Sequence, residues 1–259
     1  MSAWTLAYAV LLYVAFVVLV GGVVYRVAIY AMTPAPLRIP TMPAPRTKRG
    51  VALRMGREVA LFASLFRGDK WAWIWSYLFH ASLLLVLLQH LRYVFVPVPA
   101  WVVYESPFGS YAAFVLLISL AGLLGRRLMI ARVRFVSAPS DYLMLVLLLL
   151  IATTGAWMRF AAPVDIVGFK AFMQGVMALD LKPLPASPVI MIHVASVGAL
   201  MLVFPFSKLL HAPGVFFSPT RNQADTSRLE AQAEGSVAAA DAQQRDPGTA
   251  APALREGVR

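Results

Sequence analysis

The sequence contains no cysteine among its 259 residues and few charged side chains. The absence of cysteine excludes disulfides, iron–sulfur clusters ligated by this chain, thiolate-ligated haem and a catalytic thiol. Charged residues make up 14% of the chain, compared with about 25% in an average soluble domain. Acidic residues are the scarcer kind, because 12 Asp and Glu stand against 23 Lys and Arg. Redox chemistry would therefore need a cofactor held by ligands other than sulfur.

Long apolar runs take the place of the missing charges. Hydrophobic residues make up 60% of the chain, and the mean hydropathy is +0.72. A membrane core of about 30 Å needs roughly 20 apolar residues in a helix. Five runs meet that length: Trp4–Ile29, Trp73–Val96, Phe108–Ile130, Tyr142–Phe160 and Pro188–Leu210. We therefore predict an all-α integral membrane protein with five transmembrane helices in a bundle. The first run has no basic n-region and no small-residue cleavage site, which favours a retained span over a removed signal peptide.

The basic residues gather around two of the four connections between these runs. Nine lie from Arg26 to Lys70, around the first connection, and four lie from Arg126 to Arg134, around the third. By the positive-inside rule, these two connections and the C-terminus are cytoplasmic, and the N-terminus is periplasmic. The sequence therefore predicts a multi-pass protein of the inner membrane. The net charge of +11 is explained by this topology and gives no reason to expect nucleic acid as a partner.

Two segments outside the spans have a composition of their own. Residues 31–71 begin with a proline-rich stretch from Pro34 to Pro45, which predicts an extended linker. Apolar residues then recur at helical spacing from Val51 to Phe66, which predicts a short amphipathic helix that lies on the membrane or docks a cytoplasmic partner. Residues 222–259 have few large apolar side chains, which predicts a disordered cytoplasmic tail. The predicted division is residues 1–30 for the first span, 31–71 for this loop, 72–221 for a four-helix core and 222–259 for the tail.

All four histidines of the chain, His80, His90, His193 and His211, lie inside or at the end of predicted spans. Ionisable or metal-binding groups at membrane depth are costly and usually functional, and these occur as two pairs on two helices. Because the second and fifth spans are antiparallel, His80 should lie opposite His211 near the cytoplasmic face. His90 should lie opposite His193 near the outer face. Each pair would supply both axial ligands of a six-coordinate haem b, an arrangement suited to electron transfer. We therefore predict two haem b groups in the residue 72–221 core.

The two histidine pairs are spaced differently along the chain. Ten residues separate His80 from His90, and eighteen separate His193 from His211. In straight helices these separations correspond to about 15 Å and about 27 Å. Tilted helices, tilted haem planes or a bend at Pro205 would each bring both pairs level.

Several stretches resemble a known family, the gamma subunit of membrane-bound respiratory nitrate reductase, which is a five-helix dihaem cytochrome b. The resemblance covers roughly residues 70–221 and rests on the two histidine spacings and on Leu78–His80, Gly125–Arg127, Arg132–Arg134 and Phe204–His211. Other stretches are similar to a narrower group, the M subunit, or cytochrome b, of the membrane complex associated with dissimilatory sulfite reductase. They are the proline-rich loop, Ala52–Met55 and His211–Arg221.

The resemblance implies an electron-transfer subunit of a membrane oxidoreductase complex in dissimilatory sulfur metabolism. It implies that His80 and His211 hold the cytoplasm-side haem, and that His90 and His193 hold the outer one. A quinone or quinol, menaquinone or ubiquinone, would be handled beside the outer haem, around Gln89, His90 and Arg92. The implied partners are membrane lipid, a cytoplasmic heterodisulfide-reductase-like iron–sulfur subunit, a second membrane subunit and redox subunits on the periplasmic side.

Four arginines and one glutamine complete the candidate site. Arg126 and Arg127 lie at the cytoplasmic end of the third run, where they would pair with propionates of the inner haem or act only as topogenic charge. Arg92 and Arg159 lie near the outer ends of their spans, where the positive-inside rule disfavours them. That position favours a contact with a haem propionate or a quinone. Gln89 is a candidate contact for the quinone.

Three alternatives stay open at the level of sequence. The same cytochrome would fit the gamma subunit of a quinol-oxidising complex of the nitrate reductase type. A haem-free membrane transporter would use the histidines as a proton relay, although the spans contain almost no Asp or Glu for such a relay. A purely structural membrane anchor would leave the four histidines unexplained.

Overall fold

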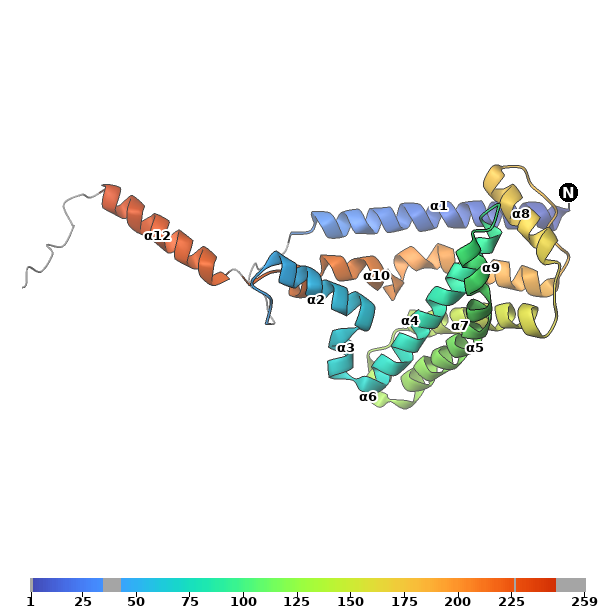
Figure 1. Ribbon diagram of the computed structural model, residues 1–259, viewed down its shortest axis with the longest axis horizontal. Coiled ribbons are helices and arrows are strands. Elements are labelled where there is room, and N and C mark those ends of the chain that lie inside the picture. The colour runs from blue at the N-terminus through green and yellow to red at the C-terminus, as the bar shows by residue number, and fades with distance from the viewer. Residues whose placement is uncertain (1, 35–42, 226, 246–259) are drawn as a thin grey trace, which may run out of the picture. The chain divides into compact units, whose positions relative to one another are not determined.

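The computed structural model describes residues 2–34, 43–225 and 227–245, and helices dominate these segments (Figure 1). The α-helices are α1 (Ala3–Met32), α2 (Lys48–Leu61), α3 (Ala63–Gly68), α4 (Lys70–His90), α5 (Ala100–Met129), α6 (Ala131–Phe135), α7 (Pro139–Phe160), α8 (Ile166–Ala178), α9 (Pro188–Val203), α10 (His211–Gly214), α11 (Pro219–Asn222) and α12 (Ser227–Arg245). Four short 3₁₀ helices join them: η1 (Leu91–Tyr93), η2 (Phe204–Phe206), η3 (Lys208–Leu210) and η4 (Val215–Phe217).

Five helical segments are long and apolar enough to cross a membrane: Ala3–Met32, Lys70–Tyr93, Ala100–Met129, Pro139–Phe160 and Pro188–Phe206. The all-α architecture with five candidate spans confirms the sequence prediction. The largest difference in boundary is at α5, which begins at Ala100 and continues through Pro107, whereas the sequence prediction started this span at Phe108. Pro99 precedes the first turn in an extended conformation, so the chain turns into the helix directly after it.

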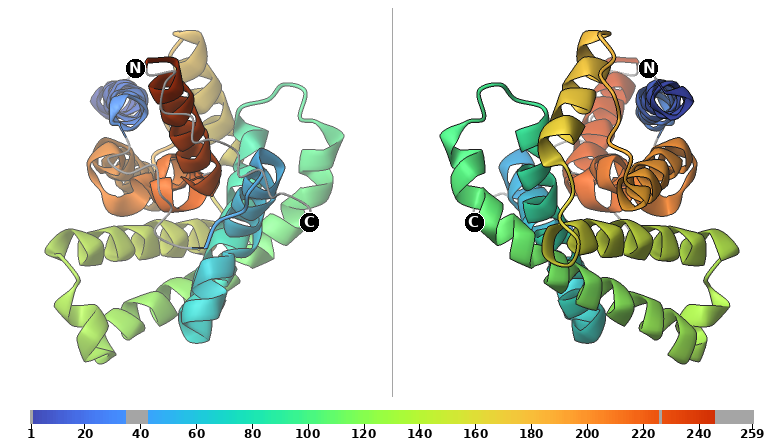
Figure 2. Two further views of the ribbon diagram at one scale, coloured as in Figure 1. Left: turned by 90° about the vertical axis from the view of Figure 1, so that its left-hand side faces the viewer. Right: turned by 90° about the vertical axis from the view of Figure 1, so that its right-hand side faces the viewer.

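The described chain divides into two units. The first comprises Met1–Met32 and Arg57–Val215, and the second comprises Thr33–Gly56 and Phe216–Arg259. All five candidate spans and all four histidines belong to the first unit. Within it, α4 packs most extensively on α5, α5 and α9 both pack on α7, and α9 packs on α1. Figure 2 shows α1 and α9 side by side when the bundle is seen along its length.

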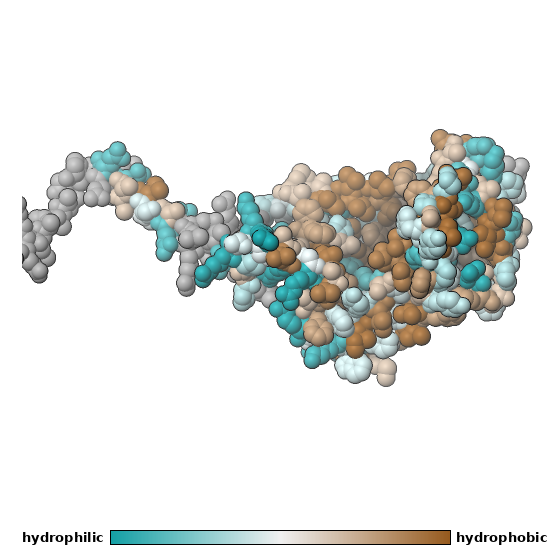
Figure 3. All heavy atoms as spheres, viewed as in Figure 1, coloured by the Kyte–Doolittle hydropathy of each residue, from teal (hydrophilic) through white to brown (hydrophobic). Residues whose placement is uncertain are grey.

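Small residues allow the spans to approach one another closely. A Cβ atom at Gly122 of α5 would come within 2.6 Å of the Trp75 ring of α4, and one at Gly22 of α1 would come within 2.5 Å of the Pro205 Cβ. Large apolar side chains instead cover much of the outside of the spans, and Figure 3 shows them in brown along α1 and its neighbours. Small residues at helix contacts with large apolar residues outside are typical of membrane bundles.

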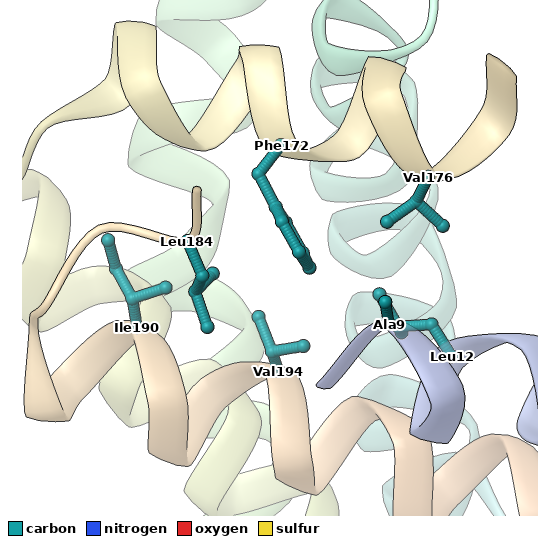
Figure 4. Packing of buried hydrophobic residues seen from close by; sticks show 7 residues of the cluster. All are labelled: Ala9, Leu12, Phe172, Val176, Leu184, Ile190 and Val194. Atoms are coloured by element: carbon teal, nitrogen blue, oxygen red, sulfur yellow. The ribbon is translucent and has the colours of Figure 1, made fainter. Parts of the chain in front are cut away.

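The helix α8 is a structural element that the sequence analysis treated as a connection. Its Phe172 is fully buried and packs with Val176 against Ala9 and Leu12 of α1 and against Val194 of α9 (Figure 4). This packing closes one end of the α1–α9 contact with a short helix that lies outside the five candidate spans.

The predicted amphipathic helix forms as two helices, α2 and α3, with a break at Phe62. This residue adopts the left-handed conformation, with φ 49° and ψ 46°. Such a backbone is costly for a bulky side chain. The ring of Phe62 packs edge-on against His80 at 4.9 Å and against Tyr77 at 5.9 Å between ring centres. The break thus places the Phe62 ring beside one of the histidines.

Two predictions fall in the second unit. Most of the proline-rich stretch, residues 35–42, lies outside the described residues. In the segment predicted to be a disordered tail, the structure contains α12, and residues 246–259 lie outside the described residues. Ala, Glu, Gln and Arg dominate the α12 sequence and are among the strongest helix formers. The helix propensity of these residues therefore favours α12, although the lack of apolar residues predicted a disordered tail in this segment.

Candidate functional site

The structure brings the four histidines together as two facing pairs. His80 of α4 and the first residue of α10, His211, have ring centres 5.8 Å apart and ring planes at 90°. His90, the last residue of α4, and His193 of α9 have ring centres 6.4 Å apart and ring planes at 10°. These are the same pairs that the antiparallel arrangement of the second and fifth spans predicts.

The different chain spacing of the two pairs is accommodated by a break in the last span. Helix α9 ends at Val203, Pro205 lies in η2, and Ser207 is extended, with φ −105° and ψ 169°. Pro205 has no amide hydrogen, so it cannot continue the hydrogen-bond pattern of α9. The eighteen residues from His193 to His211 therefore do not form a straight helix, and a bend at Pro205 was one of the three solutions that the sequence left open.

The Nδ1 atoms of three histidines are within hydrogen-bonding distance of a backbone carbonyl in the preceding turn. The distances are 2.7 Å from His80 to the Ser76 oxygen, 2.6 Å from His90 to the Val86 oxygen and 3.0 Å from His211 to the Lys208 oxygen. Because a carbonyl oxygen only accepts, Nδ1 carries the hydrogen in each ring. In the neutral imidazole, the lone pair of Nε2 is then free to bind a metal.

The Nδ1 of His193 also donates a hydrogen bond, but its acceptor is a side chain. Its Nδ1 lies 2.9 Å from Thr154 Oγ1 of α7, and that hydroxyl also lies 2.7 Å from the Leu150 carbonyl oxygen. The hydroxyl donates to the carbonyl, so its oxygen accepts from the Nδ1 of His193. The next residue of α7, Gly155, leaves space for the ring, since a Cβ atom there would lie 3.3 Å from His193 Cε1. Within the described part of the chain, the hydrogen bonds of all four histidines thus involve Nδ1 and leave Nε2 available.

The separation of the two rings in each pair matches that of two imidazoles that share one metal ion. Two metal–nitrogen bonds of about 2 Å, plus about 1 Å from each nitrogen to its ring centre, place the centres of two axial imidazoles roughly 6 Å apart. The observed separations are 5.8 Å and 6.4 Å. Among the residues that the structure describes, no group of three or more His, Cys, Asp or Glu side chains gathers to hold a metal ion. The ligand sets that the described chain offers are thus the two histidine pairs.

Aromatic rings lie beside one histidine of each pair. The Phe62 and Phe79 rings lie edge-on to His80, with ring centres 4.9 Å and 4.8 Å away. The Tyr93 ring lies 5.9 Å from His90. Rings of this kind exclude water from the faces of a cofactor and lower the local dielectric, which is one way in which a protein tunes a redox centre.

Arg126 and Arg127 of α5 each contact a carboxylate. Arg126 pairs with Asp69, and its buried Nε atom has no hydrogen-bond partner among the described residues. Arg127 NH1 donates to Ser137 Oγ at 2.7 Å and lies 3.3 Å from Asp141 Oδ2. Both arginines thus have a structural role, while Arg126 retains one free donor.

The other predicted contacts, Gln89, Arg92 and Arg159, lie in α4, η1 and α7. Gln89 Nε2 donates to Ser110 Oγ at 2.8 Å, and Arg92 NH1 lies 3.5 Å from Ser106 Oγ. Gln89 and Arg92 are therefore both tied to α5 close to His90. Arg159 is exposed near the end of α7, and the described residues contain no ion pair that involves it.

Three contact residues escaped the sequence analysis. Thr154 accepts from His193, and the carbonyl of Lys208 accepts from His211. The ammonium of Lys208 donates to Asp141 Oδ2 at 2.7 Å. An Asp in the first turn of an apolar run is a helix-start signal, but no local pattern indicates that it also pairs with a lysine 67 residues later.

Comparison with known proteins shows the family to which this chain belongs. Residues 62–223, which include all four histidines, match the family described as nitrate reductase gamma subunit. The chain is 32% identical over 261 residues to the Hdr-like menaquinol oxidoreductase cytochrome b-like subunit of Archaeoglobus fulgidus, covering 83% of this chain and 79% of the relative. It is 31% identical over 266 residues to the subunit of the same name from Archaeoglobus profundus, covering 83% and 78%. This chain belongs to the nitrate reductase gamma subunit family.

Proposed function

We propose that this chain is a dihaem b-type cytochrome of the inner membrane that transfers electrons between the quinone pool and a cytoplasmic iron–sulfur partner. The observation that carries the proposal is the pair of neighbouring imidazole couples, in which every Nδ1 is hydrogen-bonded and no described residue bonds to an Nε2. Haem supplies one-electron chemistry when bound, and six-coordination by two imidazoles leaves no open position for a substrate. Family membership supports the same reading.

In this proposal the quinone is menaquinone, whose reduced form is menaquinol, and the complex is Hdr-like. The names of both Archaeoglobus relatives contain the terms menaquinol and Hdr-like. A heterodisulfide-reductase-like iron–sulfur subunit is then the cytoplasmic partner, and further membrane and periplasmic redox subunits complete the complex. The assignment to dissimilatory sulfur metabolism rests on the similarity of the flanking stretches to the M subunit. A nitrate reductase-type complex is the second candidate, supported by the family description, and the subunits that copurify with this chain distinguish the two.

The individual roles follow from position. His80 and His211 hold the haem near the cytoplasmic face, and His90 and His193 hold the haem near the periplasmic face. Arg126 is a propionate partner of the inner haem through its free Nε. The remaining arginines, Arg92, Arg127 and Arg159, are further candidates for propionate or quinone contacts.

Haem quantitation on the purified protein tests the proposal, with a reduced-minus-oxidised spectrum of each variant. The wild type should contain two haem b per chain, and His90→Ala and His211→Ala should each contain one. Ser82→Ala is the matched control, because Ser82 lies between two of the histidines on α4 and bonds only to carbonyls of its own helix. It should retain both haems. A colourless wild type, or haem content that ignores both histidine variants, would refute the cytochrome and favour a transporter.

The proposed orientation is tested separately, and the lack of cysteine makes this simple. Single-cysteine variants Ser2→Cys and Ser236→Cys would be labelled in intact cells with a membrane-impermeant maleimide. With the N-terminus periplasmic and the C-terminus cytoplasmic, only the first should react before the cells are lysed. The opposite pattern would invert the topology and exchange the inner and outer haems.

A further inference from the structure

The break between α2 and α3 is held by a buried carboxylate. The Glu58 side chain of α2 is 4% exposed. Its Oε2 accepts from the Ser64 amide at 3.0 Å, and its Oε1 accepts from the Ser64 hydroxyl at 2.6 Å. Burial of a carboxylate is costly unless hydrogen bonds compensate for it. Because both bonds reach the first turn of α3, they join α3 to α2 across the break.

Helix α4 holds the same break from its own side. The indole Nε1 of Trp73 donates to the Leu61 carbonyl at 2.8 Å. The Trp73 ring also stacks on Tyr77, with ring centres 5.1 Å apart and planes at 21°. Tyr77 in turn contacts the Phe62 ring edge-on, at 5.9 Å between ring centres. Phe62 therefore lies between two anchored residues, Leu61 and Ser64, and its ring is held against α4.

Phe62 is one of two phenylalanines that border the His80 imidazole edge-on. The Phe62 and Phe79 rings lie 4.9 Å and 4.8 Å from it, with planes at 78° and 80° to the imidazole plane. The Nδ1 of His80 is bonded to the Ser76 carbonyl. A hydrogen bond at one ring atom does not by itself fix the plane of the ring. The two edge contacts therefore restrict the rotation that this bond leaves.

The two histidine pairs differ in the angle between their ring planes. The planes of His80 and His211 are at 90°, whereas those of His90 and His193 are at 10°. Beside His90 lies Tyr93, whose ring is farther away, at 5.9 Å, and tilted at 55°. The perpendicular arrangement thus occurs in the pair that the two phenylalanines border.

We propose that Phe62 is a positioning residue that keeps the His80 imidazole perpendicular to that of His211, and that Glu58 acts through Phe62. This inference rests on the proposed function, because the angle has a chemical effect only when both imidazoles bind one haem iron. Groups around an axial ligand orient it and thereby tune the metal. With perpendicular ligand planes, the two iron d orbitals that overlap with the imidazoles have nearly equal energies, and these energies separate as the planes become parallel.

Electron paramagnetic resonance of the oxidised protein measures this separation, because the largest g value of low-spin ferric haem rises as the two orbital energies converge. The His90→Ala background leaves only the His80–His211 pair. There, Phe62→Leu keeps an apolar side chain but removes the ring, and the largest g value should fall. Phe62→Tyr keeps the ring and should retain the wild-type value. Glu58→Ala should also lower the g value. Combined with Phe62→Leu, it should add no further shift, since residues that act through one contact are not additive.

Phe135→Leu is the matched control, because this phenylalanine of α6 is 91% exposed and lies outside the candidate spans. Its g value should not change. An unchanged g value in Phe62→Leu, or additive shifts in the double variant, would overturn the inference while the haem count still supports the proposed function. An equal shift in a His211→Ala background would overturn it too, because the effect would not be confined to the His80–His211 pair. Loss of haem from Phe62→Leu would overturn it by giving Phe62 a role in haem retention instead of orientation. A wild type without haem would refute the proposed function and the inference with it.

Discussion

The carboxylate of Asp141 anchors the segment that carries His211, and this contact allows a quantitative prediction. Asp141 Oδ2 accepts hydrogen bonds from Lys208 Nζ at 2.7 Å, from Arg127 NH1 at 3.3 Å and from the Ala138 amide at 3.0 Å. The carbonyl of Lys208 accepts from Nδ1 of His211 at 3.0 Å. Replacing Asp141 by Asn should therefore loosen the position of His211 without removing a ligand.

The size of the effect follows from burial. The Asp141 side chain is 6% exposed, and a buried hydrogen bond to a charged group contributes about 1.5–3 kcal/mol. Because the Lys208 and Arg127 side chains are 66% and 30% exposed, we discount the two contacts to roughly 2 kcal/mol together. We assign this loss of about 2 kcal/mol to the haem-bound state of the pair that contains His211. Haem should then dissociate from that pair about 30-fold faster, since 1.4 kcal/mol is a factor of ten.

Transfer of haem to an excess of a haem-binding apoprotein measures the dissociation rate. In a His90→Ala background, which leaves only the pair that contains His211, Asp141→Asn should accelerate transfer by about 30-fold. In a His211→Ala background, the same change should leave the rate of the remaining haem almost unaltered. Asp180→Asn is the control, because it removes an exposed carboxylate whose Oδ2 lies 2.7 Å from Lys182 Nζ, an ion pair of the same kind. Equal acceleration in both backgrounds would indicate a general loss of stability and refute the anchoring role.

Two further predictions concern groups beside the histidines and at the start of α4. Thr154→Val removes the acceptor for Nδ1 of His193 and should weaken haem retention at that pair about 10-fold to 100-fold, while Thr154→Ser, which keeps the hydroxyl, should restore it. The Ala72 amide that donates to Asp69, together with Arg126, lowers the pKa of the Asp69 carboxyl. Asp69 should therefore stabilise the fold above its unfolded pKa of about 3.9 and lose this effect as the pH falls through that value toward the lower native pKa. Thermal unfolding should show a larger loss of stability between about pH 5 and about pH 3 for the wild type than for Asp69→Asn, and equal losses would contradict the assignment.

The features that could be predicted from the sequence are those with local signals. Hydropathy over about 20 residues defines a span wherever its partners lie, and all five candidate spans were found in this way. The pairing of His80 with His211, and of His90 with His193, needs only the order and direction of two helices. Three of the Nδ1 contacts are local as well, because their acceptors lie three or four residues before the histidine.

The features that could not be predicted depend on tertiary packing. Helix α8 is short, and its fully buried Phe172 gains its environment from α1 and α9. The left-handed residue Phe62 packs its ring against His80, which lies eighteen residues further along the chain. The contact of Asp141 with Lys208 joins residues 67 positions apart. None of these leaves a periodic or spaced pattern in the chain.

Pro205 combines the two cases. Its effect on the α9 hydrogen bonds is local, whereas the direction of the chain after it depends on tertiary contacts. The missing amide hydrogen of a proline predicts that α9 must end or bend, and η2 follows accordingly. The direction in which the chain continues is set by what covers the proline. Pro205 is fully buried, and Gly22 of α1 lies so close that a Cβ atom there would come within 2.5 Å of the Pro205 Cβ. Helix α1, which lies outside the matched residues 62–223, therefore packs against the break at Pro205. After the break, Asp141 binds Lys208. Together they allow the broken segment from His193 to His211 to face the ten-residue spacing of His80 and His90 on α4.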